Sequence, residues 1–238
     1  RKELADERKT LLRKFGTRIY RPQRPGPSWA RVTALGSYRE VGRAMHLVTT
    51  NESKVLVDCG AKPTNNRSEV QPFFAAPEML PLDNIDAVVI THAHVDHIGM
   101  LPVLFRYGYK GPVYCTQPTR DLMTLLQMDY IKVAQAEGNE APYSKSDIQE
   151  CIKHVVDVNW GEKTDIAPDI KMTMENAGHI LGSSSVYMQI GEGRTEHKLL
   201  FSGDIKYEKS WLFDAATVRF NKVDTLVIES TYGGPQSI

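Results

Sequence analysis

The sequence has few cysteines, no long apolar run and no net charge. Cys59, Cys115 and Cys151 are far apart, odd in number and without C-x-x-C spacing. This argues against a disulfide framework or a thiolate zinc site and fits a reducing cytosol. No stretch approaches the ~20 apolar residues that a membrane span needs, and the start, RKELADERKT, lacks the apolar segment of a signal peptide. We therefore expect a cytoplasmic protein with no membrane partner.

The size and composition of the chain bound its organisation. Its 238 residues are 41% hydrophobic, which suits one large domain, or one and a half, with a sizeable core. The sequence does not begin with Met, so we expect a processed product or a piece of a longer protein. It contains no internal repeat and no low-complexity tract.

Charge is unevenly distributed along the chain. Residues 1–31 hold ten Lys or Arg against three acids, so this segment is +7 and the rest, because the net charge is zero, is −7. A basic arm on an acidic body points to a polyanionic partner, although a solvated basic helix explains it equally well. We predict a basic helix and linker over residues 1–30 and one domain over residues 31–238.

Strand-like and helix-like segments come in blocks. Helical spacing or composition predicts helices at 3–15, 100–108, 119–138 and 144–156, and the proline-rich stretch 21–27 reads as a linker. Short β-branched or apolar runs predict strands at 31–37, 44–50, 54–60, 85–90, 111–116, 170–177, 184–191, 197–203 and 223–231. Blocks of this kind favour an α/β fold of layered sheets covered by helices over regular βαβ alternation.

Residues 90–102, ITHAHVDHIGMLP, carry the strongest chemical signal. His92, His94, Asp96 and His97 follow a strand-like run. In an extended loop residues two apart point the same way, so His92 and His94 can face one ion, while Asp96 and His97 turn toward a second point. Nitrogen and carboxylate ligands without thiolate suit Zn²⁺, with Mn²⁺ and Fe as competitors. A chance polar loop is the alternative.

Further acid and imidazole groups follow other predicted strands. His179 lies in NAGHILGSSS, where Gly178 and Gly182 permit a tight backbone course, and Asp204 and Asp58 each follow a strand directly. Acids and imidazoles at four strand ends are what a metal cleft above a sheet requires. Asp58 as a plain turn residue remains an alternative.

Together these motifs resemble a known fold. H-x-H-x-D-H with the later G-H and S-G-D motifs looks like the metallo-β-lactamase αβ-βα sandwich, which binds two metals at one sheet edge. ESTYGG at 229–234 resembles the acidic motif that opens the β-CASP nuclease branch. Within that branch, GSYREVGRAMHLV, LVDCGAKP, HILGSSS and SGDIKYE look closest to archaeal relatives of the cleavage and polyadenylation specificity factor endonuclease subunit, and KFGTRIYRPQRP resembles the linker after their KH domains.

The resemblance implies roles for individual residues. His92, His94 and His179 would hold one zinc ion, and Asp96 and His97 the other, with Asp204 bridging both. Asp58 would orient the histidine loop through hydrogen bonds. Asp58, Asp96, Asp204 and Glu229 are the predicted catalytic residues, Glu229 pairing in the family with a downstream histidine. That histidine, and another completing the second site, would lie beyond Ile238, so the fold is expected to be incomplete where the β-CASP domain would begin.

The function implied is zinc-dependent hydrolysis of RNA, with single-stranded RNA as the partner, in 3′-end processing, transcription termination or 5′-to-3′ decay. Cleavage within the chain or from its end, and DNA as substrate, stay open. A glyoxalase II-like small ester hydrolase and a non-catalytic RNA-binding scaffold are the rivals. A homodimer would form through segments downstream.

Some residues allow two readings. Ser183, Ser184 and Tyr232 are weak RNA-binding candidates, although a hydrogen-bonded strand start explains the serines equally well. Tyr20, Trp29 and Tyr38 also offer rings for stacking on bases, although aromatic residues near a strand are more often part of the core. The remaining histidines are predicted to be structural: His46, His154 and His197.

Overall fold

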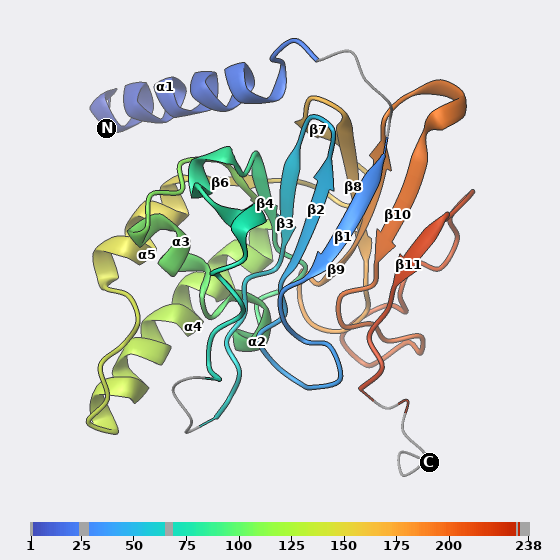
Figure 1. Ribbon diagram of the computed structural model, residues 1–238. Helices are drawn as coiled ribbons and strands as arrows, with labels where there is room; N and C mark the ends of the chain where they lie inside the picture. Colours follow the sequence, from blue (N-terminus) through green and yellow to red (C-terminus); the bar gives the residue numbers. More distant parts are fainter. Residues whose placement is uncertain (1, 24–28, 65–68, 232, 234–238) are drawn as a thin grey trace.

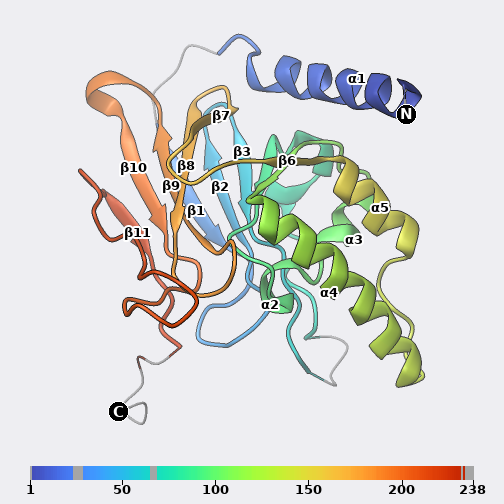
Figure 2. The same cartoon turned by 180° about the vertical axis from the view of Figure 1, so that it is seen from behind.

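The computed structural model describes residues 2–23, 29–64, 69–231 and 233, with side chains from residue 5 onward. In this part of the chain two β-sheets pack face to face, and helices cover the outer face of one of them (Figures 1 and 2). Within the described residues, no helix covers the outer face of the other sheet. The predicted α/β class with two layered sheets is confirmed.

The first sheet contains six strands in chain order: β1 (Ala30–Ala34), β2 (His46–Thr50), β3 (Lys54–Val57), β4 (Ala87–Val89), β5 (Val113–Cys115) and β6 (Val155–Asp157). β1 to β3 pair antiparallel, and β3 to β6 pair parallel. Parallel neighbours need long crossover connections, so the segments that join them carry helical turns. These segments contain two short 3-10 helices, η1 (Pro77–Met79) and η2 (Leu82–Asn84). They also contain four α-helices, α2 (Val95–Ile98), α3 (Leu101–Arg106), α4 (Gln117–Ala136) and α5 (Lys145–Lys153).

The long helices begin at residues that satisfy their free N–H groups. Thr116 caps α4 by accepting a hydrogen bond from the Thr119 N–H, and a proline occupies the first turn. Ser144 and Asp147 form a reciprocal capping box at the start of α5. None of the described helices has both the length and the apolar character needed to cross a membrane.

The second sheet contains five strands in the order β11-β10-β9-β8-β7. They are β7 (Lys163–Ala167), β8 (Ile170–Asn176), β9 (Ser184–Ile190), β10 (His197–Phe201) and β11 (Thr225–Val227), with the short turn η3 (Gly193–Thr195) between β9 and β10. Only the β10–β11 pair is parallel. β3, β4, β10 and β11 all end at the same end of the sandwich (Figure 1).

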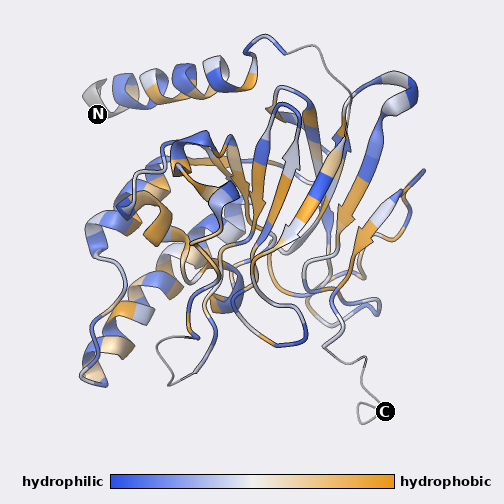
Figure 3. Ribbon diagram, in the orientation of Figure 1, coloured by the Kyte–Doolittle hydropathy of each residue, from blue (hydrophilic) through white to orange (hydrophobic). Residues whose placement is uncertain are grey.

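Two apolar cores hold the layers together, and β3 contributes to both. Val55 and Val57 face the second sheet, where they join Met172 and Met188. Leu56 points the other way, into the core beneath the helices. Because successive side chains of a strand point to opposite faces, a run such as KVLV marks a strand buried on both sides. Figure 3 shows this hydrophobic band along the strands.

Helix α1 (Lys2–Ile19) lies across the end of the sandwich where β2 ends and β3 begins (Figure 1). Phe15 and Ile19 are buried beneath it. Arg8 donates to the carbonyls of Lys153 and Val155, and Arg18 pairs with Asp83 at 2.7 Å. Arg21 pairs in the same way with the buried Asp86. Part of the basic arm is therefore bound to the body of the protein, and most of the predicted linker, residues 24–27, lies outside the described residues.

Three segments differ from their prediction. Val95–Ile98 forms the short helix α2, where an extended loop was expected. The helix expected at 144–156 ends at Lys153, because His154 caps it and Val155 begins strand β6, paired with Val113. β-Branched valines pack well in a strand, and pairing with β5 decides the outcome. Strand β7 was not predicted, because its sequence, KTDIA, carries too little apolar alternation.

Candidate metal centre

The predicted site residues gather where the strands end. Asp58 follows β3, His92 and His94 follow β4, His179 lies in the loop between β8 and β9, and Asp204 follows β10. These loops lie at one end of the sandwich, opposite α1 (Figure 1). Both sheets therefore contribute to the same small volume.

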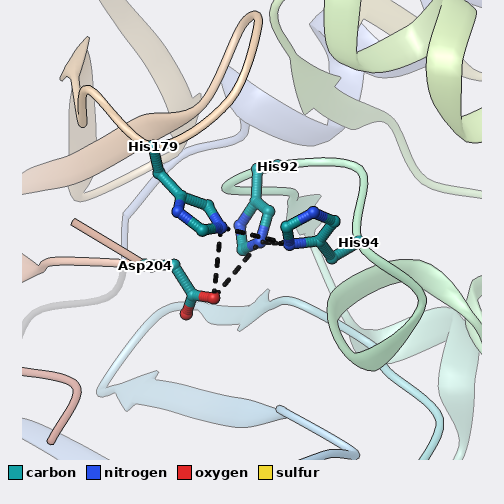
Figure 4. Close-up of side chains that lie close together, drawn as sticks. All are labelled: His92, His94, His179 and Asp204. Atoms are coloured by element: carbon teal, nitrogen blue, oxygen red, sulfur yellow. Dashed lines mark hydrogen bonds and ion pairs between the residues drawn. The ribbon is translucent and has the colours of Figure 1, made fainter. Parts of the chain in front are cut away.

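Four side chains form a first ligand group (Figure 4). One ligand atom from each of His92, His94, His179 and Asp204 lies within 4.8 Å of the other three. His94 Nδ1 is 3.1 Å from both His92 Nε2 and His179 Nε2, and Asp204 Oδ2 is 3.6 and 3.5 Å from those same Nε2 atoms. Zinc bonds of about 2.0–2.1 Å in a tetrahedron separate ligand atoms by about 3.3 Å. The four measured separations are near this value, so the group could hold a metal ion with tetrahedral ligands, such as zinc.

Two imidazoles of this group, those of His92 and His179, are in the neutral form that binds metal ions. Burial, with the charges of the neighbouring histidines, lowers the pKa of His92 well below its ordinary value. Burial also lowers the pKa of His179, outweighing the opposing charge of Asp204. Both rings are therefore neutral near pH 7, and a neutral ring is the form that binds a metal.

A second group lies beside the first and shares Asp204. His97 Nε2 is 3.3 Å from Asp204 Oδ1 and 3.7 Å from Asp96 Oδ2. His94 is the N-cap of the short helix α2 and has extended backbone. The helical turn that follows brings His97 Nε2 to the other oxygen of Asp204, while the His97 ring stays beside that of His92, with centroids 4.0 Å apart. The two oxygens of Asp204 thus face different groups, as a bridging carboxylate would.

Asp58 holds the second group in place. Its carboxylate lies 2.8 Å from His97 Nδ1 and accepts hydrogen bonds from the backbone N–H and the hydroxyl of Thr91. Burial lowers the pKa of His97, but the charges and hydrogen bonds of Asp58 and Asp204 outweigh it and raise that pKa to about 10. Asp58 itself has φ +61°, a strained value that aims its side chain at the histidine loop.

Close backbone approach completes the arrangement. A Cβ at Gly60 would lie 1.6 Å from the carbonyl oxygen of Asp96, so only glycine lets the loop after β3 pack against α2. Gly178, with φ +70°, allows the same tight course before His179. The prediction for Gly178 is confirmed, whereas Gly60 and Thr91 were missed. Their only sequence signal is their position, immediately after a strand and next to a predicted ligand.

A cleft of about 670 Å³ opens beside the second group. It lies between the loop 37–44 and the chain after β10 and β11, and Asp96, His97, Asp204 and Glu229 line it. The Glu229 carboxylate accepts hydrogen bonds from the backbone N–H groups of Ile205 and Thr231 at 3.0 and 3.3 Å. Glu229 therefore ties the loop after Asp204 to the end of β11.

Comparison with known proteins places this site in a family. The sequence model of the metallo-beta-lactamase superfamily domain matches residues 47–230. The chain belongs to the metallo-beta-lactamase superfamily. The superfamily fold is also seen in a subclass B3 metallo-beta-lactamase from a soil metagenome, with a TM-score of 0.53 and 16% identity over 88% of this chain and 80% of that one.

Curated members of the superfamily are much more similar in sequence. The chain is 50% identical to the transcription termination factor FttA of Methanosarcina mazei and 52% identical to that of Methanococcus maripaludis, in each case over 95% of this chain. It spans only 35% of the length of these relatives. They are archaeal proteins, which fits the resemblance to the archaeal β-CASP branch.

The structure describes two of the three weak RNA-binding candidates. Ser183 and Ser184 are buried: the Ser183 hydroxyl accepts from the His179 N–H, and the Ser184 hydroxyl accepts from Trp160 Nε1. Neither hydroxyl faces solvent, so the hydrogen-bonded strand start describes them better than RNA binding. Tyr232 lies outside the described residues.

The histidines predicted to be structural have local contacts. Buried His154 packs against the rings of Phe15 and Phe105, and its Nδ1 is 2.8 Å from the Gly111 carbonyl. His197 Nε2 is 2.9 Å from the Thr225 hydroxyl. Neither belongs to the ligand groups.

Proposed function

We propose that this chain is part of a two-zinc ribonuclease that hydrolyses phosphodiester bonds of single-stranded RNA. The observation that carries the proposal is the pair of ligand groups joined by Asp204, one with tetrahedral spacing and the other open to the cleft. Relatives named transcription termination factors support a role in termination or 3′-end processing, and decay from the 5′ end is compatible with the same site.

Each group of residues has a part in this proposal. His92, His94 and His179 would hold one ion, Asp96 and His97 the second, and Asp204 both. Bound zinc supplies Lewis acidity and activates water near neutral pH, and it offsets charge on the phosphoryl group.

Two carboxylates outside the ligand groups keep these residues in place. Asp58 fixes the ring orientation of His97, as partners of metal-binding histidines generally do. Glu229 fixes the loop that presents Asp204, through the Ile205 N–H. Its proposed partnership with a downstream histidine, and the ligand that would complete the second site, concern residues outside this sequence.

The rivals differ in what the cleft must accept. A small ester hydrolase would use the same ligands, so the ligand groups alone do not separate it from a nuclease. A non-catalytic scaffold would not need two ligand groups with metal-binding geometry. The similarity to termination factors favours nucleic acid over a small ester. Cytoplasmic location and a homodimer through other segments are part of the proposal.

Zinc content and RNA cleavage test the proposal together. Purified protein should contain close to two zinc ions and cleave single-stranded RNA, and His94→Ala should lose one ion and the activity. His197→Ala, which removes an imidazole outside both ligand groups, is the matched control. Zinc without cleavage would show that this chain alone is not a nuclease. RNA binding with no zinc would favour the scaffold.

A further inference from the structure

The loop between β1 and β2 forms one wall of the cleft and has unusual backbone geometry. Ser37, Arg39 and Arg43 have φ values of +71°, +60° and +46°, in the left-handed region that side chains rarely adopt. Such strain persists only where surrounding contacts impose it, and it concentrates at functional sites.

Ionic contacts impose this conformation. The Glu40 carboxylate accepts from Arg43 Nε at 2.6 Å and from Lys62 Nζ at 2.8 Å. These hydrogen bonds, Arg43 first, lower the pKa of Glu40 to about 2. The backbone after the loop is fixed to the metal centre, because the Ala44 N–H donates to the Asp96 carbonyl. The loop therefore holds a set position relative to the second ligand group.

Two side chains of this rigid loop remain available at the cleft. Tyr38 is 53% exposed, and its ring meets the ring of His46 edge-on at 5.6 Å, with Phe201 beneath His46. The Tyr38 ring is therefore held by its contact with His46, and about half of the residue's surface remains exposed to solvent. Arg39 is exposed, and within the described part of the chain no hydrogen bond or ion pair engages its guanidinium.

Arg39 is a cation in a cleft that is lined mainly by acidic side chains among its charged residues. Among the described residues that line the cleft, five are acids, Arg39 is the only arginine, and none is lysine. A polyanion that enters the cleft passes close to Arg39, and arginine is well suited to bind phosphate oxygens. An aromatic ring next to it offers a stacking platform that accepts any base.

We propose that Tyr38 and Arg39 form a nucleotide subsite of the cleft: Tyr38 stacks on a base of single-stranded RNA, and Arg39 binds a phosphate next to the one that is cleaved. This inference rests on the proposed function and specifies how the substrate is held. The subsite reads the presence of a base and a phosphate, not the sequence, because neither a stacked ring nor a phosphate contact discriminates between bases.

Equilibrium binding of a fluorescent ten-nucleotide single-stranded RNA to the zinc-loaded chain tests the subsite. Tyr38→Ala should weaken binding by about 5- to 150-fold, the usual worth of one stacked base, whereas Tyr38→Phe should bind as wild type does. Arg39→Ala should reduce the slope of log affinity against log salt by about 0.7, as expected for one phosphate contact to a single strand. In cleavage assays both substitutions should raise KM for RNA.

Two controls lie away from the cleft. Tyr107→Ala removes a ring that is 68% exposed after α3, and Arg194→Ala removes an exposed guanidinium in η3. If wild type binds RNA and the Tyr38 and Arg39 variants match these controls, the subsite is wrong and the nuclease proposal stands. Wild-type protein that hydrolyses bis(p-nitrophenyl) phosphate but does not bind RNA overturns both. Since Arg39 is exposed, its variant tests the subsite even if Tyr38→Ala fails to fold.

Discussion

Binding of an ion at the second group should release a proton from His97, and this release can be measured. In the metal-free protein burial opposes the charged ring, but Asp58 and Asp204 raise the pKa of His97 to about 10, so the ring is protonated near neutral pH. A metal needs the same Nε2 atom without its proton. At pH 7.5 this competition should weaken binding of the second ion by about 300-fold relative to a deprotonated site.

The affinity of the second group for its ion should increase with pH. Affinity for the second ion should rise about tenfold per pH unit between pH 7 and 9, because one proton is displaced per ion. The first ion should show little dependence, since burial lowers the pKa values of His92 and His179 and these rings are already neutral.

Calorimetric zinc titration in two buffers of different ionisation enthalpy counts the protons released at pH 7.5. Asp58→Asn is the informative variant, because it keeps the shape of the side chain and removes the charge that raises the pKa of His97. We expect close to one proton with the second ion in wild type and fewer in the variant. Equal release from both proteins, or the same pH slope for both ions, would refute the assigned role of Asp58.

Three further predictions follow from the same geometry. Thr91→Val removes the hydroxyl that bonds to Asp58, so we expect zinc affinity at the second group to fall by about 10- to 100-fold, with little change in Thr124→Val, whose hydroxyl bonds only within α4. Gly60→Ala forces the loop away from the Asp96 carbonyl and should destabilise the protein by about 1–3 kcal/mol or more in denaturant titrations; unchanged stability would contradict the close approach. Removal of zinc by a chelator should lower Tm, because ions at 1,000 times their Kd stabilise the fold by about 4 kcal/mol.

The parts of the site that follow strands could be predicted from sequence, and the parts that depend on distant contacts could not. Asp58 and Asp204 each follow an apolar run, and strand ends at one edge of a sheet bring such residues together. Thr91 and Gly60 also lie just after strands, but a hydroxyl or a glycine at such a position does not by itself indicate a role in a metal site. The hydroxyl of Thr91 matters only because Asp58, 33 residues earlier, lies beside it. Gly60 matters only because α2 packs against its backbone.

Charge was the least reliable guide. The basic segment at the N-terminus predicted an arm for a polyanion, yet Arg8, Arg18 and Arg21 bind carbonyls and carboxylates of the body at the end opposite the ligands. Composition counts charges but not their partners. Arg39 lies at a cleft lined by five acids, and among the described residues its guanidinium has no such partner.

The first ligand group exists only when the two sheets are packed. His92 and His94 come from the first sheet, whereas His179 and Asp204 come from loops of the second. What fixes their spacing is the core between the sheets, where Val57 and Val89 meet Met174 and Val186. An ion held by all four ligands would therefore join the sheets at this end, whereas α1 lies across the opposite end (Figure 1). Because ligand spacing and sheet packing depend on one another, loss of core packing far from the ligands must weaken metal binding, and metal binding must stabilise that packing by the same free energy.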